Sequence, residues 1–270
     1  MIRALQAEFS KLKRARMILW TALVIIGYTS IGLATYPVLE DLVLDMEERV
    51  AAGDLSAQDN VFVEAGIDEI NWETAMRFIP MGVSGAWGMM LLSLVTAYVF
   101  GRELREGTDI ASATLPVRRE AFIVAKMIVV AVWATGLALL AVIAQVGVDA
   151  IYLGFEGFEW VYPWRGFVDT LYAMLPLYLT MPLVAWLSMR RKGYLWPMLF
   201  ALATFTVASS LIGTDLAAYV PWSMPIVLFG VTWMPLTGEL TAASWVIALA
   251  VFGIGMLLVL RRANRAVETA

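Results

Sequence analysis

The chain has 270 residues and a formal net charge of −4; 61% of its residues are hydrophobic, 16% are charged, and its mean hydropathy is +0.77. Soluble globular proteins carry about 45–50% apolar and about 25% charged residues, so this composition excludes a water-soluble domain and is typical of a chain surrounded by lipid. The absence of Cys and His excludes disulfides, thiol catalysis, and the commonest metal ligand and general base.

Residues 1–16 are predicted to form an amphipathic helix in the plane of the lipid headgroups. Four apolar side chains recur at helical spacing, and basic residues occupy the remaining face: the apolar set is Ile2, Leu5, Phe9 and Leu12. Such a helix binds an anionic cytoplasmic leaflet through both faces. The alternative is a soluble basic flank that only sets topology.

Six apolar stretches reach the length of about 20 residues that a hydrocarbon core of about 30 Å requires. They are residues 17–36, 79–100, 122–148, 169–189, 194–213 and 244–260. The first is nearly a full span, so it is predicted to be a retained helix and not a cleaved signal. An additional apolar piece over 221–236 contains three prolines and is predicted to be a broken helix or re-entrant piece before the last span. The predicted fold is all-α, a single polytopic membrane domain over residues 1–270.

Basic residues are distributed unequally among the predicted loops. The N-terminal segment, the 101–126 loop, the 190–192 turn and the C-terminus hold all but three of the 19 Lys and Arg residues. The positive-inside rule therefore places both termini in the cytoplasm, as six crossings also require. The acidic 37–78 loop is predicted to lie outside and to contain a short amphipathic helix over 39–50. Its charge either attracts cationic peptides or is the solvated remainder after basic residues are kept inside.

The spans are expected to lack ionisable groups at depth. Away from their ends they contain no Asp, Glu, Arg or His, and Lys126 is close enough to a cytoplasmic end to extend to the headgroups. Ion-coupled carriers usually need ionisable groups at depth, and intramembrane hydrolases need an acid–base set or a metal, so both classes are disfavoured. The sequence also lacks a G-x-x-x-x-G-K-[ST] phosphate loop, so we do not expect the chain to be an enzyme that hydrolyses ATP by that route.

Three glycines at a spacing of three occur in the second predicted span: Gly82, Gly85 and Gly88. Small residues on one helix face allow another helix to approach closely. These glycines are candidates for a subunit contact or for the lining of a substrate path. The alternative is packing within one subunit.

The loop between the second and third predicted spans carries the most informative pattern. Residues 101–108 are Gly-Arg-Glu-Leu-Arg-Glu-Gly-Thr, and residues 115–119 are Leu-Pro-Val-Arg-Arg. Gly107 is predicted to end the preceding helix, and Thr108 to cap a short new helix that ends at Pro116. The pattern therefore predicts a short cytoplasmic helix that a protein partner can contact. The alternative is an ordinary polar loop.

The order and placement of these residues resemble the permease subunits of ABC-2 type transporters. The residues that carry the resemblance are Glu103, Glu106, Gly107, Thr108, Leu115, Pro116, Arg118, Arg119 and Lys126. The opening segment 7–13, Ala-Glu-Phe-Ser-Lys-Leu-Lys, resembles the group linked to bacitracin and lantibiotic self-protection, as do the six-span layout and the large first outer loop. Residues 109–114 depart from that group, because they are smaller and more polar than the Leu-rich segment common there.

The resemblance implies an exporter driven by a separate cytoplasmic ABC ATPase. ATP and Mg²⁺ would bind in that partner, and this chain would hold no cofactor, metal or catalytic residue. The coupling helix would lie within 103–116. Two copies, or one copy and a homologous permease, would form the path in a bacterial plasma membrane, in contact with lipid and not with nucleic acid. A hydrophobic or amphipathic cargo, such as a peptide antibiotic or a lipid-like molecule, would suit spans without buried charge. The alternatives are a non-transporting scaffold or receptor subunit and, less favoured, an ion-coupled carrier.

Overall fold

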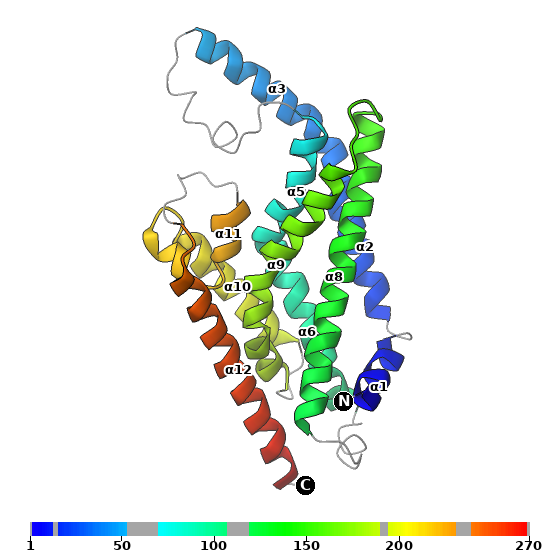
Figure 1. Cartoon of the computed structure of the whole chain (residues 1–270), viewed down its shortest axis with the longest axis vertical. Coiled ribbons are helices and arrows are strands. Elements are labelled where there is room, and N and C mark those ends of the chain that lie inside the picture. The colour runs from blue at the N-terminus through cyan, green and yellow to red at the C-terminus, as the bar shows by residue number, and fades with distance from the viewer. Residues whose placement is uncertain are drawn as a thin grey trace.

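The computed structural model describes residues 2–12, 16–52, 70–106, 119–189, 194–230 and 239–268, and these residues form helices and short connections without strands. The helices form an elongated bundle, and the two ends of the chain lie at the same end of it (Figure 1). We call this end the base. The all-α prediction is confirmed for the described residues.

The N-terminal part of the chain forms three consecutive helices. Helix α1 (Ile2–Leu12) is the predicted amphipathic helix and lies at the base (Figure 1). Helices α2 (Arg16–Ser30) and α3 (Gly32–Ala51) follow each other closely, and Arg16–Asp45 is apolar and long enough to cross a membrane. The first span thus extends beyond its predicted end, and the amphipathic helix predicted over 39–50 is the outer part of α3. Only 11% of the most apolar window of this span is buried, so most of its surface is available to lipid.

The second predicted span is not a straight helix. Helix α5 (Trp72–Ser84) and helix α6 (Ala86–Glu106) meet at an angle of 58°. The side-chain oxygen of Asn71 accepts hydrogen bonds from the first turn of α5, including the N–H of Thr74 at 3.0 Å, and this capping starts α5 well before residue 79. Gly85 lies between the two helices, where a break in the helical hydrogen-bond pattern produces a kink.

The long helices pack around α9. Helix α8 (Arg119–Tyr152) is joined to α9 (Val161–Ser188) by a turn in which two glycines adopt positive φ. Helix α9 contacts α5, α6, α8 and also α12 (Ala242–Glu268), which places it at the centre of the bundle. At 1.5 Å per residue α8 is about 51 Å long, well beyond a hydrocarbon core of about 30 Å. Helices α8, α9 and α12 all extend beyond their predicted ranges.

Between α9 and α12 the described residues, 194–230, form one medium helix and two short ones. Helix α10 (Leu195–Ser210) is apolar but only 16 residues long, the 3-10 helix η2 (Asp215–Tyr219) follows, and α11 (Met224–Phe229) packs on α5 and α9. The broken piece predicted over 221–236 is thus a short helix in its first part, and its remainder lies outside the described residues.

The described residues contain four helices that are long and apolar enough to span a membrane, and five if the bent α5–α6 pair counts as one span. Helix α10 is a sixth apolar helix but is shorter than these. A polytopic helical protein is therefore confirmed, and the number six stays a prediction.

Candidate functional site at the base of the bundle

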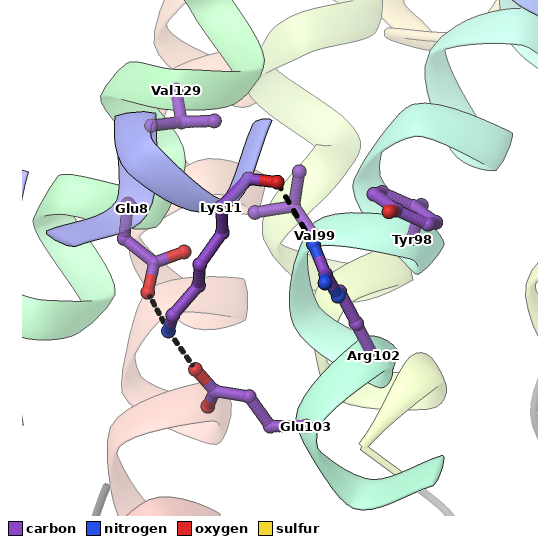
Figure 2. Close-up of a pocket in the computed structure, with 7 residues that line it drawn as sticks. All are labelled: Glu8, Lys11, Tyr98, Val99, Arg102, Glu103 and Val129. Carbon is purple, nitrogen blue, oxygen red and sulfur yellow. Dashed lines mark hydrogen bonds and ion pairs between the residues drawn. The ribbon is translucent and has the colours of Figure 1, made fainter. Parts of the chain in front are cut away.

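Four charged side chains from three helices meet at the base, and we call them the base cluster. They are Glu8 and Lys11 of α1, Glu103 of α6 and Lys126 of α8. The ammonium of Lys11 lies 2.6 Å from one carboxylate oxygen of Glu103 and 2.7 Å from the carboxylate of Glu8 (Figure 2). The other oxygen of Glu103 lies 3.2 Å from the ammonium of Lys126. One carboxylate near the end of α6 thus joins α1 to α8.

The amphipathic pattern of α1 explains its position. Glu8 and Lys11 are three residues apart, so they share one helix face and reach α6 together. The guanidinium of Arg102 donates a hydrogen bond of 3.1 Å to the backbone carbonyl of Lys11 (Figure 2). The last carbonyls of a helix have no partner within the helix, so this bond satisfies one of them and fixes the end of α1 against α6.

Lys126 does not extend to the headgroups as predicted. Its residue is 4% exposed, and its ammonium donates a hydrogen bond of 2.9 Å to the backbone carbonyl of Val99. The rings of Phe100 and Phe122 lie 5.6 Å and 5.1 Å from the same ammonium. A buried charge requires a partner of opposite sign and hydrogen-bond acceptors, and Glu103, whose side chain is 15% exposed, is the carboxylate that supplies them.

Lys11 is less enclosed, with 35% of its side chain exposed. Burial lowers the pKa of Lys11, but hydrogen bonds and attraction to Glu103 and Glu8 outweigh that effect and raise the pKa above its ordinary value. The raised pKa favours the protonated form of Lys11, which is the form that pairs with the carboxylate of Glu103.

Two arginines join further helices at the base. Arg119, the first residue of α8, donates a hydrogen bond of 2.6 Å to the carbonyl of Ala263 in α12. Arg262 of α12 donates to the carbonyl of Met189, which caps the C-terminal end of α9, at 3.2 Å and 3.3 Å. Helices α8, α12 and α9 are therefore held together at the base by bonds from arginine to backbone carbonyls.

The predicted coupling residues lie on both sides of residues 107–118, which the structure does not describe. Glu103 lies in the last turns of α6, Glu106 ends that helix, and Arg119 begins α8. The other five lie outside the described residues: Gly107, Thr108, Leu115, Pro116 and Arg118. The structure thus brings Glu103 and Arg119 to one end of the bundle and bonds each of them to another helix.

The sequence interpretation did not predict the contacts that Glu8, Lys11, Arg102 and Arg262 make in the fold. One signal was present, because Glu8 is the only acidic residue among the five basic residues of the first 16 positions. An isolated acid in a basic helix indicates a specific partner, and Lys11 is that partner within α1.

The three glycines of the predicted packing face lie at the break between α5 and α6. A Cβ at Gly82 would overlap the ring of Tyr28 in α2, and a Cβ at Gly88 would overlap the backbone of Val83 across the bend. The N–H of Gly85 donates to the carbonyl of Met81 at 3.2 Å and ends α5. All three positions therefore have local roles within the chain, and a contact with a second subunit through this face stays a prediction.

A second polar cluster lies toward the opposite end of the bundle. Tyr36 of α3 donates a hydrogen bond of 2.7 Å to the carboxylate of Asp149 in α8, and the amide of Gln145 donates to the same oxygen at 2.8 Å. Asp149 is fully buried, and its other oxygen has no hydrogen-bond partner among the described residues. Helix α8 continues past the predicted end of the third span at residue 148, so Asp149, just beyond that end, is a buried acid within this helix.

Comparison with known proteins identifies a family that the chain matches. Residues 4–209 match the protein family described as "ABC-2 family transporter protein". Over 148 residues the chain is 26% identical to the "Bacitracin transport permease protein BCRB" of Bacillus licheniformis, which covers 55% of this chain and 71% of that relative. No solved structure matches the chain. The family match includes all four residues of the base cluster and ends before α11 and α12.

Proposed function

Because the chain belongs to the ABC-2 transporter family, we propose that it is the permease subunit of an ATP-driven exporter whose ATPase is a separate cytoplasmic protein. The family match and the apolar helices make it a multi-pass membrane transport protein. The name of the Bacillus licheniformis relative supports transport of a hydrophobic or amphipathic cargo, of which peptide antibiotics are the first to test. The plasma membrane of a bacterium is the proposed location. The Lys- and Arg-rich end of the bundle, which we call the base, and both termini would lie in the cytoplasm.

The proposed contact with the ATPase is the segment from Glu103 to Arg119. The observation that carries this proposal is the attachment of both flanks of the segment at the base. Glu103 is bonded to Lys11 in α1 and Lys126 in α8, and Arg119 is bonded to α12. A displacement of a segment held in this way is passed to α1, α6, α8 and α12 together. ATP-driven closure of two ATPase subunits would move the segment and so reorient the helices of two permease copies, or of one copy and a homologue.

The proposal is tested first by purification. The chain carries a C-terminal affinity tag, is extracted from its native membrane in mild detergent and is analysed for co-purifying proteins. We expect an ABC ATPase in a fixed ratio to the chain, and ATP hydrolysis that is lost when this protein is removed. Absence of any nucleotide-binding protein, also after chemical cross-linking in the membrane, contradicts the proposal.

Coupling is then tested by substitution within the segment. Glu106→Ala and Gly107→Val are expected to leave expression and insertion near normal, because an exposed ion pair in a cytoplasmic loop contributes only about 0–1 kcal/mol, and to lower transport per ATP hydrolysed in reconstituted vesicles. Glu156→Ala, in the turn between α8 and α9 at the opposite end, is the matched control. If transport per ATP hydrolysed is the same in both segment variants as in the unchanged protein, the segment does not couple ATP hydrolysis to transport. Hydrolysis without transport of any cargo by the unchanged protein would instead favour a scaffold subunit.

A further inference from the structure

The break between α5 and α6 forms the wall of an apolar pocket. The pocket is an open groove that encloses about 570 Å³ when the space on its open side is included. Five helices contribute to its lining, namely α2, α5, α6, α8 and α9. The lining is almost wholly apolar. The hydroxyl of Thr170, one of its few polar groups, is bonded to the carbonyl of Gly166 at 2.6 Å.

The pocket lies near the middle of the bundle's apolar length. Leu92 of its lining is 11 residues from Glu103 along α6, and Ala138 is 12 residues from Lys126 along α8. At 1.5 Å per residue both distances from the base cluster are about 17 Å, close to half of a hydrocarbon core of about 30 Å. The lining holds no charged side chain, and its side-chain polar groups are limited to those of Tyr28, Trp87 and Thr170, so it suits a hydrocarbon chain better than a charged group.

The pocket opens toward lipid. Val24 and Trp87, which belong to its lining, are 40% and 50% exposed, and they lie on α2 and α6. Helix α2 belongs to the span of which very little is buried, so the lipid phase reaches the edge of the pocket. Protein interiors are packed as densely as organic crystals, and apolar atoms that line a void lose dispersion contacts. A hydrocarbon chain from the bilayer is the occupant that restores these contacts.

We propose that this pocket binds one acyl chain of a membrane phospholipid, which enters between α2 and α6 and packs against the bend formed by α5 and α6. The headgroup stays at the membrane surface, and the chain supports the bend from within the membrane. The binding requires neither ATP nor the ATPase. It is therefore an addition to the proposed transport function, and it is tested without a transport measurement.

The test uses the purified protein in lipid nanodiscs that contain a phospholipid with a diazirine in the middle of one acyl chain. After illumination, labelled peptides are identified by mass spectrometry. We expect labelling at Leu91 and Leu92 of the pocket to exceed labelling at Leu139 and Leu249, which are exposed on the lipid-facing surface. Equal labelling of the two sets overturns the proposal, because it indicates bulk lipid only.

A pair of substitutions on α8 separates the pocket from the general surface. Ala138→Phe places a ring into the pocket, whereas Gly136→Phe places the same ring where no atom lies within 4 Å of the new Cβ. We expect pocket labelling to fall at least several-fold in Ala138→Phe and to be unchanged in Gly136→Phe. If Ala138→Phe does not fold, judged by its elution from a sizing column, Ala141→Leu serves in its place. Unchanged labelling in the folded pocket variant overturns the proposal.

A third part of the experiment tests whether the pocket is occupied by an acyl chain of a lipid or by cargo. Bacitracin, the molecule named for the Bacillus licheniformis relative, is added to the nanodiscs before illumination. Labelling of the pocket that is unaffected by bacitracin supports a resident lipid. Loss of the label in a bacitracin-dependent manner assigns the pocket to cargo and overturns the proposal of a lipid site.

Discussion

Replacing Glu103 by Gln removes the carboxylate that Lys11 and Lys126 share. The two lysines differ in burial, so the loss affects them differently. Lys126 is nearly enclosed and, among the described residues, keeps the carbonyl of Val99 and two aromatic rings as partners. Lys11 is about one third exposed and keeps its pair with Glu8. The stability change therefore comes mainly from the ammonium of Lys126.

The magnitude follows from this difference in burial. Removing one partner of a buried ion pair costs about 3–5 kcal/mol, whereas an exposed pair contributes about 0–1 kcal/mol. Glu103 is partly exposed and Lys126 keeps other partners, so we expect a cost of about 2–4 kcal/mol for Glu103→Gln and at most about 1 kcal/mol for Lys11→Met. Removing both buried charges in Glu103→Gln with Lys126→Met should recover most of the loss, because replacing a buried pair by apolar groups is often close to neutral.

Thermal unfolding of the purified chain in detergent measures these differences. The 11 Trp residues provide an intrinsic fluorescence signal, and one scan rate is used throughout because unfolding of such proteins is commonly irreversible. At about 2–4 °C per kcal/mol, Glu103→Gln should lower Tm by at least about 4 °C and Lys11→Met by less than about 4 °C. Equal shifts for the two variants, or a double variant that is less stable than Glu103→Gln, would refute the assignment of Lys126 as the dependent charge.

Three further predictions concern topology, the helix break and the outer polar cluster. In the Cys-free chain, Ser56→Cys should react with an impermeant thiol reagent in intact cells and Ser112→Cys should not; the reverse result inverts the topology. Gly88→Ala should lower Tm more than Gly82→Ala, because the new methyl meets backbone at Gly88 and only the movable end of a tyrosine at Gly82, and the opposite order contradicts the described bend. Tyr36→Phe should cost about 1–3 kcal/mol of stability, since it removes a buried donor from a carboxylate, and a Tm equal to that of the unchanged protein would exclude this bond.

Hydropathy predicted most of what depends on local composition. The apolar stretches each contain a helix, and the periodicity of the first 16 residues predicted α1 and its amphipathic character. The family resemblance, derived from the order of residues around Glu103 and Lys126, is confirmed by the match over residues 4–209. These signals lie within sequence windows of the length of one helix. Spanning segments in lipid must be apolar and must satisfy their own backbone hydrogen bonds, so such windows predict helices directly.

Helix ends and polar partners were predicted less well, because they depend on residues far apart in the sequence. The predicted third span stopped at residue 148, since a carboxylate ends an apolar run. In the fold, Asp149 remains helical and buried because Tyr36, more than 100 residues away, donates to it. The burial of Lys126 was also missed because its partner is not local in the sequence. Glu103 belongs to the preceding helix, and the packing of α6 against α8 brings the two side chains together.

The break at Gly85 shows a different limit. Three glycines at a spacing of three are equally compatible with a smooth face for close helix packing and with a kink. The distinction depends on what occupies the space beside each glycine, which is Tyr28 at one position and the backbone of the same chain at another. A single sequence does not contain that information.

The basic residues at the base have a second role besides topology. The positive-inside rule counts them only as charges, but the structure bonds Arg102, Arg119 and Arg262 to carbonyls near the ends of α1, α12 and α9. The carbonyls of Lys11 and Met189 lie at the C-terminal ends of their helices, where the partial negative charge makes a guanidinium favourable on both electrostatic and hydrogen-bonding grounds. Neutral substitutions at these positions would therefore weaken the connections between helices as well as the topological signal. The arginines from which the topology is predicted also join helices around the segment proposed to contact the ATPase.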